Sequence, residues 1–260
     1  MSRFIHLIAD YGTGDPAFSE VIHRLKSEDP GVEVQPTAVE PLSTVATGFW
    51  IEQLGVHNPA FDELLIYSNT APRSDDASPR DANEGGDLCY AELDSGSEVV
   101  AVDAGYNFSF VKDHLETFRR IDVPASGSQF RSRDYFPEKV IEIAHGDHTS
   151  VADARPRGRV PDRPERTVCH VDGYGNIKTS LRASEFDPGP GRIEIEIGSS
   201  AATVATGETV FGVDEGELVL APGSTGGADS YLELFRRGGS AAAEFGGPRP
   251  GDRVRISQPR

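Results

Sequence analysis

The segment VDGYGNIKTSL, residues 171–181, carries several polar side chains for so short a turn. Gly173 and Gly175 can supply the positive φ that a tight hairpin turn needs, so they call for no functional explanation. Asp172 and Asn176 flank the turn four residues apart, where a carboxylate and an amide can point at a single polar ligand. The spacing indicates a small-molecule contact, with a purely structural hairpin as the alternative.

A second candidate residue is Asp10, which ends the apolar run FIHLIAD at 4–10. Such a run followed by Tyr-Gly predicts a buried strand and then a loop. In α/β sheets, ligands bind at the carboxyl ends of the strands. A carboxylate at that place can accept hydrogen bonds from both hydroxyls of a ribose. A helix-capping or loop role for Asp10 fits the sequence equally well.

Other motifs give weaker indications of chemistry. His145 and His148 have no third ligand at a suitable spacing, so we predict no metal site. The glycine-rich segment GSTGG at 223–227 is not followed by a Lys-Ser/Thr pair that opens a helix, which argues against a phosphate-binding loop. No nucleophile elbow supports a Ser-His-Asp arrangement.

The charge balance is strongly acidic. The 260 residues include 42 Asp and Glu against 25 Lys and Arg, a formal net charge of -17. An acidic surface poor in lysine is typical of halophilic proteins, because concentrated salt screens the self-repulsion. The same balance argues against nucleic acid as a partner. No apolar run of membrane-spanning length occurs. Cys89 and Cys169 follow no ligand spacing, which favours a cytoplasmic location.

The first half of the chain alternates strand and helix patterns. We expect helices over 15–31, 42–55 and 137–144, strands over 4–10, 32–36 and 62–69, and an antiparallel pair within 88–105. Asp15 and Pro16 form a typical helix start, and Ser43 or Thr44 can cap the second helix. Alternation of this kind predicts an α/β layered domain.

The second half has a different pattern. Residues 153–165, DARPRGRVPDRPE, contain four arginines and three prolines and predict a linker. After it, segments such as RIEIEIG alternate apolar and polar residues with period two, separated by turn residues, which predicts a small β-barrel or sandwich. The expected fold is thus α/β, with an N-terminal α/β layered domain at 1–152, a linker at 153–165 and a small C-terminal β domain at 166–260.

Five segments in this order resemble the S-adenosylmethionine (SAM) hydroxide adenosyltransferases, a family that also contains fluorinating and chlorinating enzymes. LIADYGTGDPAF is similar to a strand followed by Asp-Phe-Gly and Asp-Pro-Tyr, and VDAGYNFSF to a Pro-Asp-Asn-Gly segment. QFRSRDYF resembles Phe-His-Gly-Arg-Asp-x-Phe, and VDGYGNIKTSL resembles Ile-Asp-x-Phe-Gly-Asn-x-x-Thr-Asn-Ile. YLELFRRGGSAA is similar to a Leu-Glu-Ile…Gly-Asn-Ala-Ala stretch.

The resemblance implies roles for the candidate residues. Asp172 and Asn176 would hold the methionine part of SAM, and Asp10 would hold the ribose diol. The other implied substrate contacts are Trp50, Ser224, Arg236 and Arg237. The resemblance further implies that SAM is the substrate, that no cofactor is needed, and that the protein is a homotrimer. In such a trimer the sites lie between the α/β domain of one subunit, on the ribose and nucleophile side, and the β domain of the next.

The chain departs from the family pattern where hydrolytic members place a water with Asp, Arg and His. The Asp position reads Asn69, the Arg is Arg73 or Arg80, and the His position reads Arg131. Ser132 stands where one halide-using member carries a Ser. Asn69, Thr70, Ser132 and the arginines donate hydrogen bonds, and none is anionic, which suits an anion better than a water.

Three interpretations therefore stay open. The chain is a hydrolase that releases adenosine and L-methionine by substitution at the ribose 5′ carbon, a halide adenosyltransferase, or a non-catalytic SAM- or adenosine-binding protein. In the first two, the candidate catalytic residues are Asn69, Arg73, Arg131 and Ser132.

Overall fold

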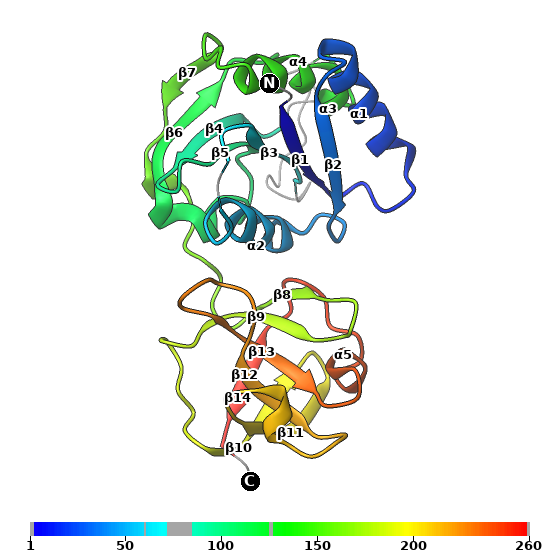
Figure 1. The fold of residues 1–260 in the computed structure, drawn as a ribbon, viewed down its shortest axis with the longest axis vertical. Helices are drawn as coiled ribbons and strands as arrows, with labels where there is room; N and C mark the ends of the chain where they lie inside the picture. Colours follow the sequence, from blue (N-terminus) through cyan, green and yellow to red (C-terminus); the bar gives the residue numbers. More distant parts are fainter. Residues whose placement is uncertain (1–2, 60, 72–84, 125–126, 259–260) are drawn as a thin grey trace. The chain divides into compact units, whose positions relative to one another are not determined.

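The computed structural model describes residues 3–59, 61–71, 85–124 and 127–258. Arg73 and Arg80 lie outside the described residues. The chain divides into two compact units, Met1–Asp162 and Arg163–Arg260, which Figure 1 shows in the colours of the sequence.

The N-terminal unit is built on a mixed sheet with the strand order β2-β1-β3-β5-β4-β6-β7. Strands β1, β2, β3 and β5 run parallel, whereas β4 and β7 each pair antiparallel to their neighbours. The strands are β1 (Phe4–Ala9), β2 (Glu33–Ala38), β3 (Leu64–Asn69), β4 (Leu88–Leu93), β5 (Glu98–Val102), β6 (Leu115–Ile121) and β7 (Val151–Ala154).

Helices cover both faces of this sheet. The helical segments are α1 (Pro16–Glu28), α2 (Thr44–Gly55), α3 (Arg131–Asp134), α4 (Phe136–Ala144) and the 3-10 turns η1 (Ser109–His114) and η2 (Arg157–Arg159). The predicted caps are present, because the side chain of Asp15 accepts a hydrogen bond from Ala17 N and that of Ser43 from Ala46 N.

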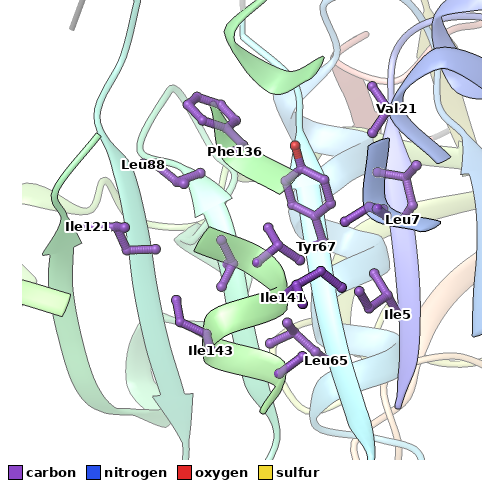
Figure 2. Packing of buried hydrophobic residues seen from close by; sticks show 14 of the residues in the cluster. Ile5, Leu7, Val21, Leu65, Tyr67, Leu88, Ile121, Phe136, Ile141 and Ile143 are labelled. Atoms are coloured by element: carbon purple, nitrogen blue, oxygen red, sulfur yellow. The ribbon is translucent and has the colours of Figure 1, made fainter. Parts of the chain in front are cut away.

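The alternation of strand residues divides the core into two layers. Ile5 of β1 packs in the cluster that includes α1 and α4, whereas Ile8 packs in the cluster on the α2 side. Figure 2 shows the first cluster, in which Ile141 and Ile143 of α4 lie among the sheet residues Ile5, Leu65 and Ile121. The predicted α/β layered domain is confirmed.

The start of the predicted linker is part of the N-terminal unit. Asp153 and Ala154 belong to β7, which pairs with β6, and residues 157–159 form η2. The Arg119 side chain donates to Ala152 O at 2.9 and 2.7 Å, which adds side-chain bonds to the β6–β7 pairing. Val160 is buried in the cluster on the α2 side. The arginine- and proline-rich composition did not reveal these contacts.

The C-terminal unit is a second sheet, in the order β14-β10-β11-β12-β13-β9-β8. Its elements are β8 (Val168–Val171), β9 (Ile177–Arg182), β10 (Gly191–Ile197), β11 (Ser200–Thr206), β12 (Leu218–Pro222), β13 (Tyr231–Arg236), β14 (Val254–Ser257), η3 (Val210–Gly212) and α5 (Ala241–Glu244). A bridge between Thr167 and Arg253 joins the two ends of the sheet. The sheet is therefore curled, as expected for the small β domain.

The period-two pattern sets the core of this unit. Ile193, Ile195 and Ile197 of β10 are buried, while the two glutamates between them are partly exposed. None of the helices in the described part of the chain is long and apolar enough to cross a membrane.

Candidate functional site

The strand order of the N-terminal sheet creates a switch point at the end of β1. The chain leaves β1 through α1 on one face and reaches β3 through α2 on the other face. Ligands of open α/β sheets bind where the strand order reverses in this way, outside the carboxyl ends of the strands. Ala9 pairs with Asn69 in register, so Asp10 and Asn69 lie at this edge.

Tyr11 joins two of the predicted catalytic residues. Its hydroxyl donates to Ser132 Oγ at 2.7 Å, and the Asn69 side chain also hydrogen-bonds to it. Ser132 is 4% exposed. The Tyr11 ring packs edge-on against Phe18 and Phe130, with centroids 5.1 and 5.7 Å away. We call Asp10, Tyr11, Asn69 and Ser132 the carboxyl-edge group.

The environment of Tyr11 keeps its hydroxyl protonated. Burial raises the pKa of Tyr11 well above its ordinary value, and the negative charge of Asp10 acts in the same direction. The hydrogen bonds with Ser132 and Asn69 only partly oppose these effects on the pKa. Tyr11 is therefore a neutral hydrogen-bond donor at physiological pH and not a base.

Asp10 and the end of β3 are held by backbone contacts. Asp10 Oδ2 accepts a hydrogen bond from Leu42 N at 2.9 Å, and Leu42 has a φ of +63°, which is uncommon for a leucine. Thr70 is buried and accepts from the Thr47 hydroxyl at 2.9 Å. The Asn107 amide donates to Thr70 O at 2.8 Å. These hydrogen bonds fix the Asp10 side chain and the backbone that follows β3.

Arg131 and Trp50 make structural contacts in the same unit. Arg131 donates to Gly86 O at 3.0 Å and to Pro124 O at 3.2 Å, and its guanidinium carbon lies 5.1 Å from the Phe136 ring centroid. Burial lowers the pKa of Arg131, while the charge of Asp87 acts against that change. The Trp50 ring lies 6.4 Å from that of His6. The substrate and nucleophile roles of Arg131 and Trp50 stay predictions.

The hairpin between β8 and β9 is shaped by Asp172. Its Oδ1 accepts from Tyr174 N at 2.9 Å and Asn176 N at 3.0 Å, and its Oδ2 accepts from the Asn176 amide at 3.0 Å. Gly175 has a φ of +83°, and a Cβ there would lie 2.0 Å from Ser240 Oγ, so the turn requires glycine. Burial raises the pKa of Asp172, but the hydrogen bonds from Asn176 and Tyr174 and the charge of Lys178 outweigh it, so the pKa is lowered.

A buried ion pair connects this hairpin to the loop that carries Ser224. Lys178 Nζ lies 2.8 Å from Glu233 Oε2 and 3.7 Å from Asp172 Oδ2. Glu233 Oε1 accepts from Ser224 N at 3.1 Å and Thr225 Oγ1 at 3.0 Å. Lys178 is 8% and Glu233 1% exposed. We call Asp172, Asn176, Lys178 and Glu233 the hairpin group.

Sequence reasoning missed three members of the two groups. Lys178 and Glu233 stand inside the apolar strand patterns IKTSL and YLELF, and they pair in register between β9 and β13. Two opposite charges within apolar strands are the signal that could have identified them, since buried charges are almost always paired. Tyr11 gave no comparable signal, because its partner Ser132 is 121 residues away in the chain.

Arg236 and Arg237 lie at the end of β13 and contact the neighbouring turns. Arg236 Nε donates to Gly216 O at 3.0 Å, and Nη1 pairs with Glu244 at 2.5 Å. The Arg237 side chain donates to Val213 O. Their predicted position beside adenine, like the methionine contact of Ser224, stays a prediction.

The two histidines considered for a metal site have carboxylate partners. His145 Nε2 lies 3.0 Å from Asp29 Oδ2, and His148 Nε2 lies 3.3 Å from Glu98 Oε1. Within the ranges that the structure describes, no group of three or more His, Cys, Asp or Glu side chains could hold a metal ion.

A comparison with protein families gives a match over the segment that contains the hairpin group. Residues 166–255 match the family model described as SAM hydroxide adenosyltransferase C-terminal domain. The match covers most of the C-terminal unit, Arg163–Arg260. The resemblance seen in the sequence is thereby confirmed over the segment that holds Asp172, Asn176, Lys178 and Glu233. The match indicates a SAM-using activity of the adenosyltransferase or hydrolase type.

Solved structures support the fold along nearly the whole chain. An uncharacterized conserved protein from Thermotoga maritima is 20% identical with a TM-score of 0.70, covering 97% of this chain and 99% of its own. A conserved hypothetical protein from Thermus thermophilus is 21% identical with a TM-score of 0.67, covering 98% and 99%. At this identity the similarity shows the fold. A search of curated proteins found no match.

Proposed function

We propose that this protein hydrolyses SAM to adenosine and L-methionine. The observation that carries the proposal is the family match over residues 166–255, which contains the hairpin group. The carboxyl-edge group supports it, because polar side chains gather at the switch point of the N-terminal sheet.

The reaction is a substitution at the 5′ carbon of the ribose. The water oxygen forms a bond to C5′ while the C5′–S bond breaks. The electron pair of the C5′–S bond stays on sulfur, which leaves as the neutral thioether of methionine. The attacking water loses one proton to solvent. Because the sulfonium is already a good leaving group, the protein has mainly to align the water opposite sulfur, and the proposal includes no cofactor.

The hairpin group suits the amino-acid end of SAM. A carboxylate offers about four lone-pair positions, and Asp172 uses three for the hydrogen bonds from Tyr174 N, Asn176 N and the Asn176 amide. One position is left for the substrate ammonium, with Asn176 near the substrate carboxylate and Ser224 as a further contact. Asp10 takes the ribose diol. Trp50, Arg236 and Arg237 complete the proposed substrate contacts.

Transfer of the adenosyl group to a halide is the second candidate function. It is favoured by the character of the carboxyl-edge group around Ser132, where hydroxyl and amide groups take the place of the family's acidic residue. Neutral donors can bind an anion without charge repulsion.

One experiment separates the candidates. The protein is incubated with SAM in H₂¹⁸O, once with chloride and once with sulfate at equal ionic strength, and the released nucleoside is identified by mass spectrometry. Hydrolysis gives adenosine labelled at the 5′ oxygen in both salts. A chloride-dependent 5′-chloro nucleoside would support the halide function. Calorimetric binding of SAM without any nucleoside product would contradict both functions and favour a binding protein.

We also propose a halophilic homotrimer with a cytoplasmic location. The trimer rests on the family resemblance, and the salt requirement on the net charge of -17. Light scattering in several molar salt should give the mass of three chains, and the unfolding temperature should fall as salt is removed. A monomer under these conditions would contradict the trimer, and full stability in salt-free buffer would contradict the salt adaptation.

A further inference from the structure

Three departures from the family pattern contact one another in this protein. Tyr11 stands where the pattern has Phe, Asn69 where it has Asp, and Ser132 where it has Gly. The Tyr11 hydroxyl bonds to Ser132 Oγ at 2.7 Å and to the Asn69 side chain, although the three residues come from separate segments of the chain. The hydroxyl that Tyr adds to Phe is therefore the atom that links the other two.

The direction of these hydrogen bonds follows from the number of protons. The Tyr11 hydroxyl has a single proton, which it donates to Ser132 Oγ. Asn69 must then reach the Tyr11 oxygen as a donor, through its amide nitrogen. This arrangement orients the Asn69 carbonyl oxygen away from Tyr11. Ser132 Oγ keeps one lone pair and its own proton for a further partner.

We propose that Tyr11 is a positioning residue that, through Ser132 Oγ and the Asn69 amide, orients the water that attacks C5′. The inference rests on the proposed hydrolysis and adds how the water is held. The water donates its protons to the Ser132 lone pair and the Asn69 carbonyl oxygen, and its own lone pair faces C5′. The bond changes are those given above, and neutral acceptors take the place of the family's acidic residue.

Packing alone does not require the Tyr11 hydroxyl. The ring is held edge-on by Phe18 and Phe130, and a phenylalanine would keep both contacts. Tyr11→Phe therefore removes the oxygen and leaves the ring in place, which makes it a suitable test of the inference.

The test compares steady-state kinetics of adenosine release. We expect Tyr11→Phe to lower kcat by about 10- to 100-fold through loss of alignment, with an unchanged KM for SAM. Ser132→Ala should lower kcat to a similar extent, and the double variant should lose no more than either single one, because the two residues act as one unit. Ser132→Ala also serves if Tyr11→Phe does not fold.

Tyr90→Phe is the matched control. Tyr90 also donates a short phenol hydrogen bond, at 2.6 Å to Glu98, but Glu98 lies at the amino end of β5, away from the carboxyl-edge group. Its kcat should equal that of the wild type. If Tyr11→Phe has the wild-type kcat, or changes only KM or the unfolding temperature, the inference about Tyr11 is wrong. The proposed hydrolysis would still stand. A wild type that releases no adenosine would instead overturn the proposed hydrolysis, and the inference with it.

Discussion

The carboxyl-edge group and the hairpin group hold their polar atoms in different ways. In the hairpin group, Lys178 and Glu233 are buried as an ion pair, and Asp172 lies beside them. Two carboxylates and one ammonium leave one net negative charge, which suits a cationic amine. In the carboxyl-edge group, Tyr11 and Ser132 are neutral and linked by a directional hydrogen bond. A fixed charge favours binding of an ion, whereas directional hydrogen bonds between neutral groups favour alignment of a small neutral reactant.

The largest expected effect concerns the buried ion pair. Lys178→Met leaves Glu233 buried without its cation, and breaking such a pair typically costs about 3–5 kcal/mol of unfolding free energy. Denaturant unfolding, followed by a signal from the C-terminal unit, measures the loss. The double variant Lys178→Met/Glu233→Met should regain part of it, because no unpaired charge is then buried.

Arg255→Met is the control for that comparison. Arg255 pairs with Glu196 in the same unit, and their side chains are 62% and 44% exposed, so removal of this pair should cost about 1 kcal/mol or less. Equal losses in Lys178→Met and Arg255→Met would show that burial of the charges does not set the contribution of the pair to stability.

The next effect concerns the charge offered to the ligand. Asp172→Asn keeps an oxygen that can accept from Tyr174 N and Asn176 N, but it removes the charge. The binding free energy of the ligand should weaken by about 1.5–3 kcal/mol, which is the usual contribution of a hydrogen bond to a charged group. Calorimetry with S-adenosylhomocysteine measures this, because that ligand has the same amino-acid end and no sulfonium to displace.

Asp187→Asn provides the matched control for the loss of affinity. Asp187 also shapes a turn in the C-terminal unit, where its Oδ1 accepts from Gly189 N at 2.8 Å. It belongs to neither group, so its substitution should leave the affinity unchanged. If the two variants bind the ligand equally well, Asp172 shapes the hairpin and does not contact the substrate.

Local signals made most of the fold predictable. Asp15 and Pro16 marked the start of α1, and the period-two pattern of RIEIEIG marked β10. Contacts distant in the sequence were missed. Asp153 and Ala154 extend β7 because β6 pairs with it, which the composition of the segment does not indicate.

For the candidate site, the sequence indicated single residues and not the contacts between them. The spacing of Asp172 and Asn176 predicted that both face one ligand, and the structure shows that they also hydrogen-bond to each other. Asn69 and Ser132 were identified one by one, from the resemblance. Their connection through Tyr11 depends on the α3 segment lying over the ends of β1 and β3, and such tertiary placement leaves no trace in the local pattern.

Alkaline pH should report on the carboxyl-edge group. The pKa of Tyr11 is raised above its ordinary value of 10.0, so above about pH 10 the unfolded chain loses this proton and the folded one keeps it. Unfolding becomes more favourable, by up to about 1.4 kcal/mol for each pH unit. Tyr11→Phe has no phenol at this position, so it should lose less stability at alkaline pH than the wild type. The pKa values of Tyr67 and Tyr90 are also raised, but both residues are present in the two proteins and contribute equally. Parallel stability curves above pH 10 would contradict a buried Tyr11 hydroxyl.

Acidic pH should report on the hairpin group, with the smallest effect. The pKa of Asp172 is lowered from its ordinary value of 3.8, so its stabilising contribution is present above about pH 4 and is lost as the pH falls through the lowered value. The difference in unfolding free energy between the wild type and Asp172→Asn should therefore shrink below about pH 4, since the asparagine does not titrate. If the difference instead stays constant down to the acid transition, the charge of Asp172 does not stabilise the turn. The hydrogen bonds from Tyr174 N and Asn176 N, which both proteins can form, would then be what fixes it.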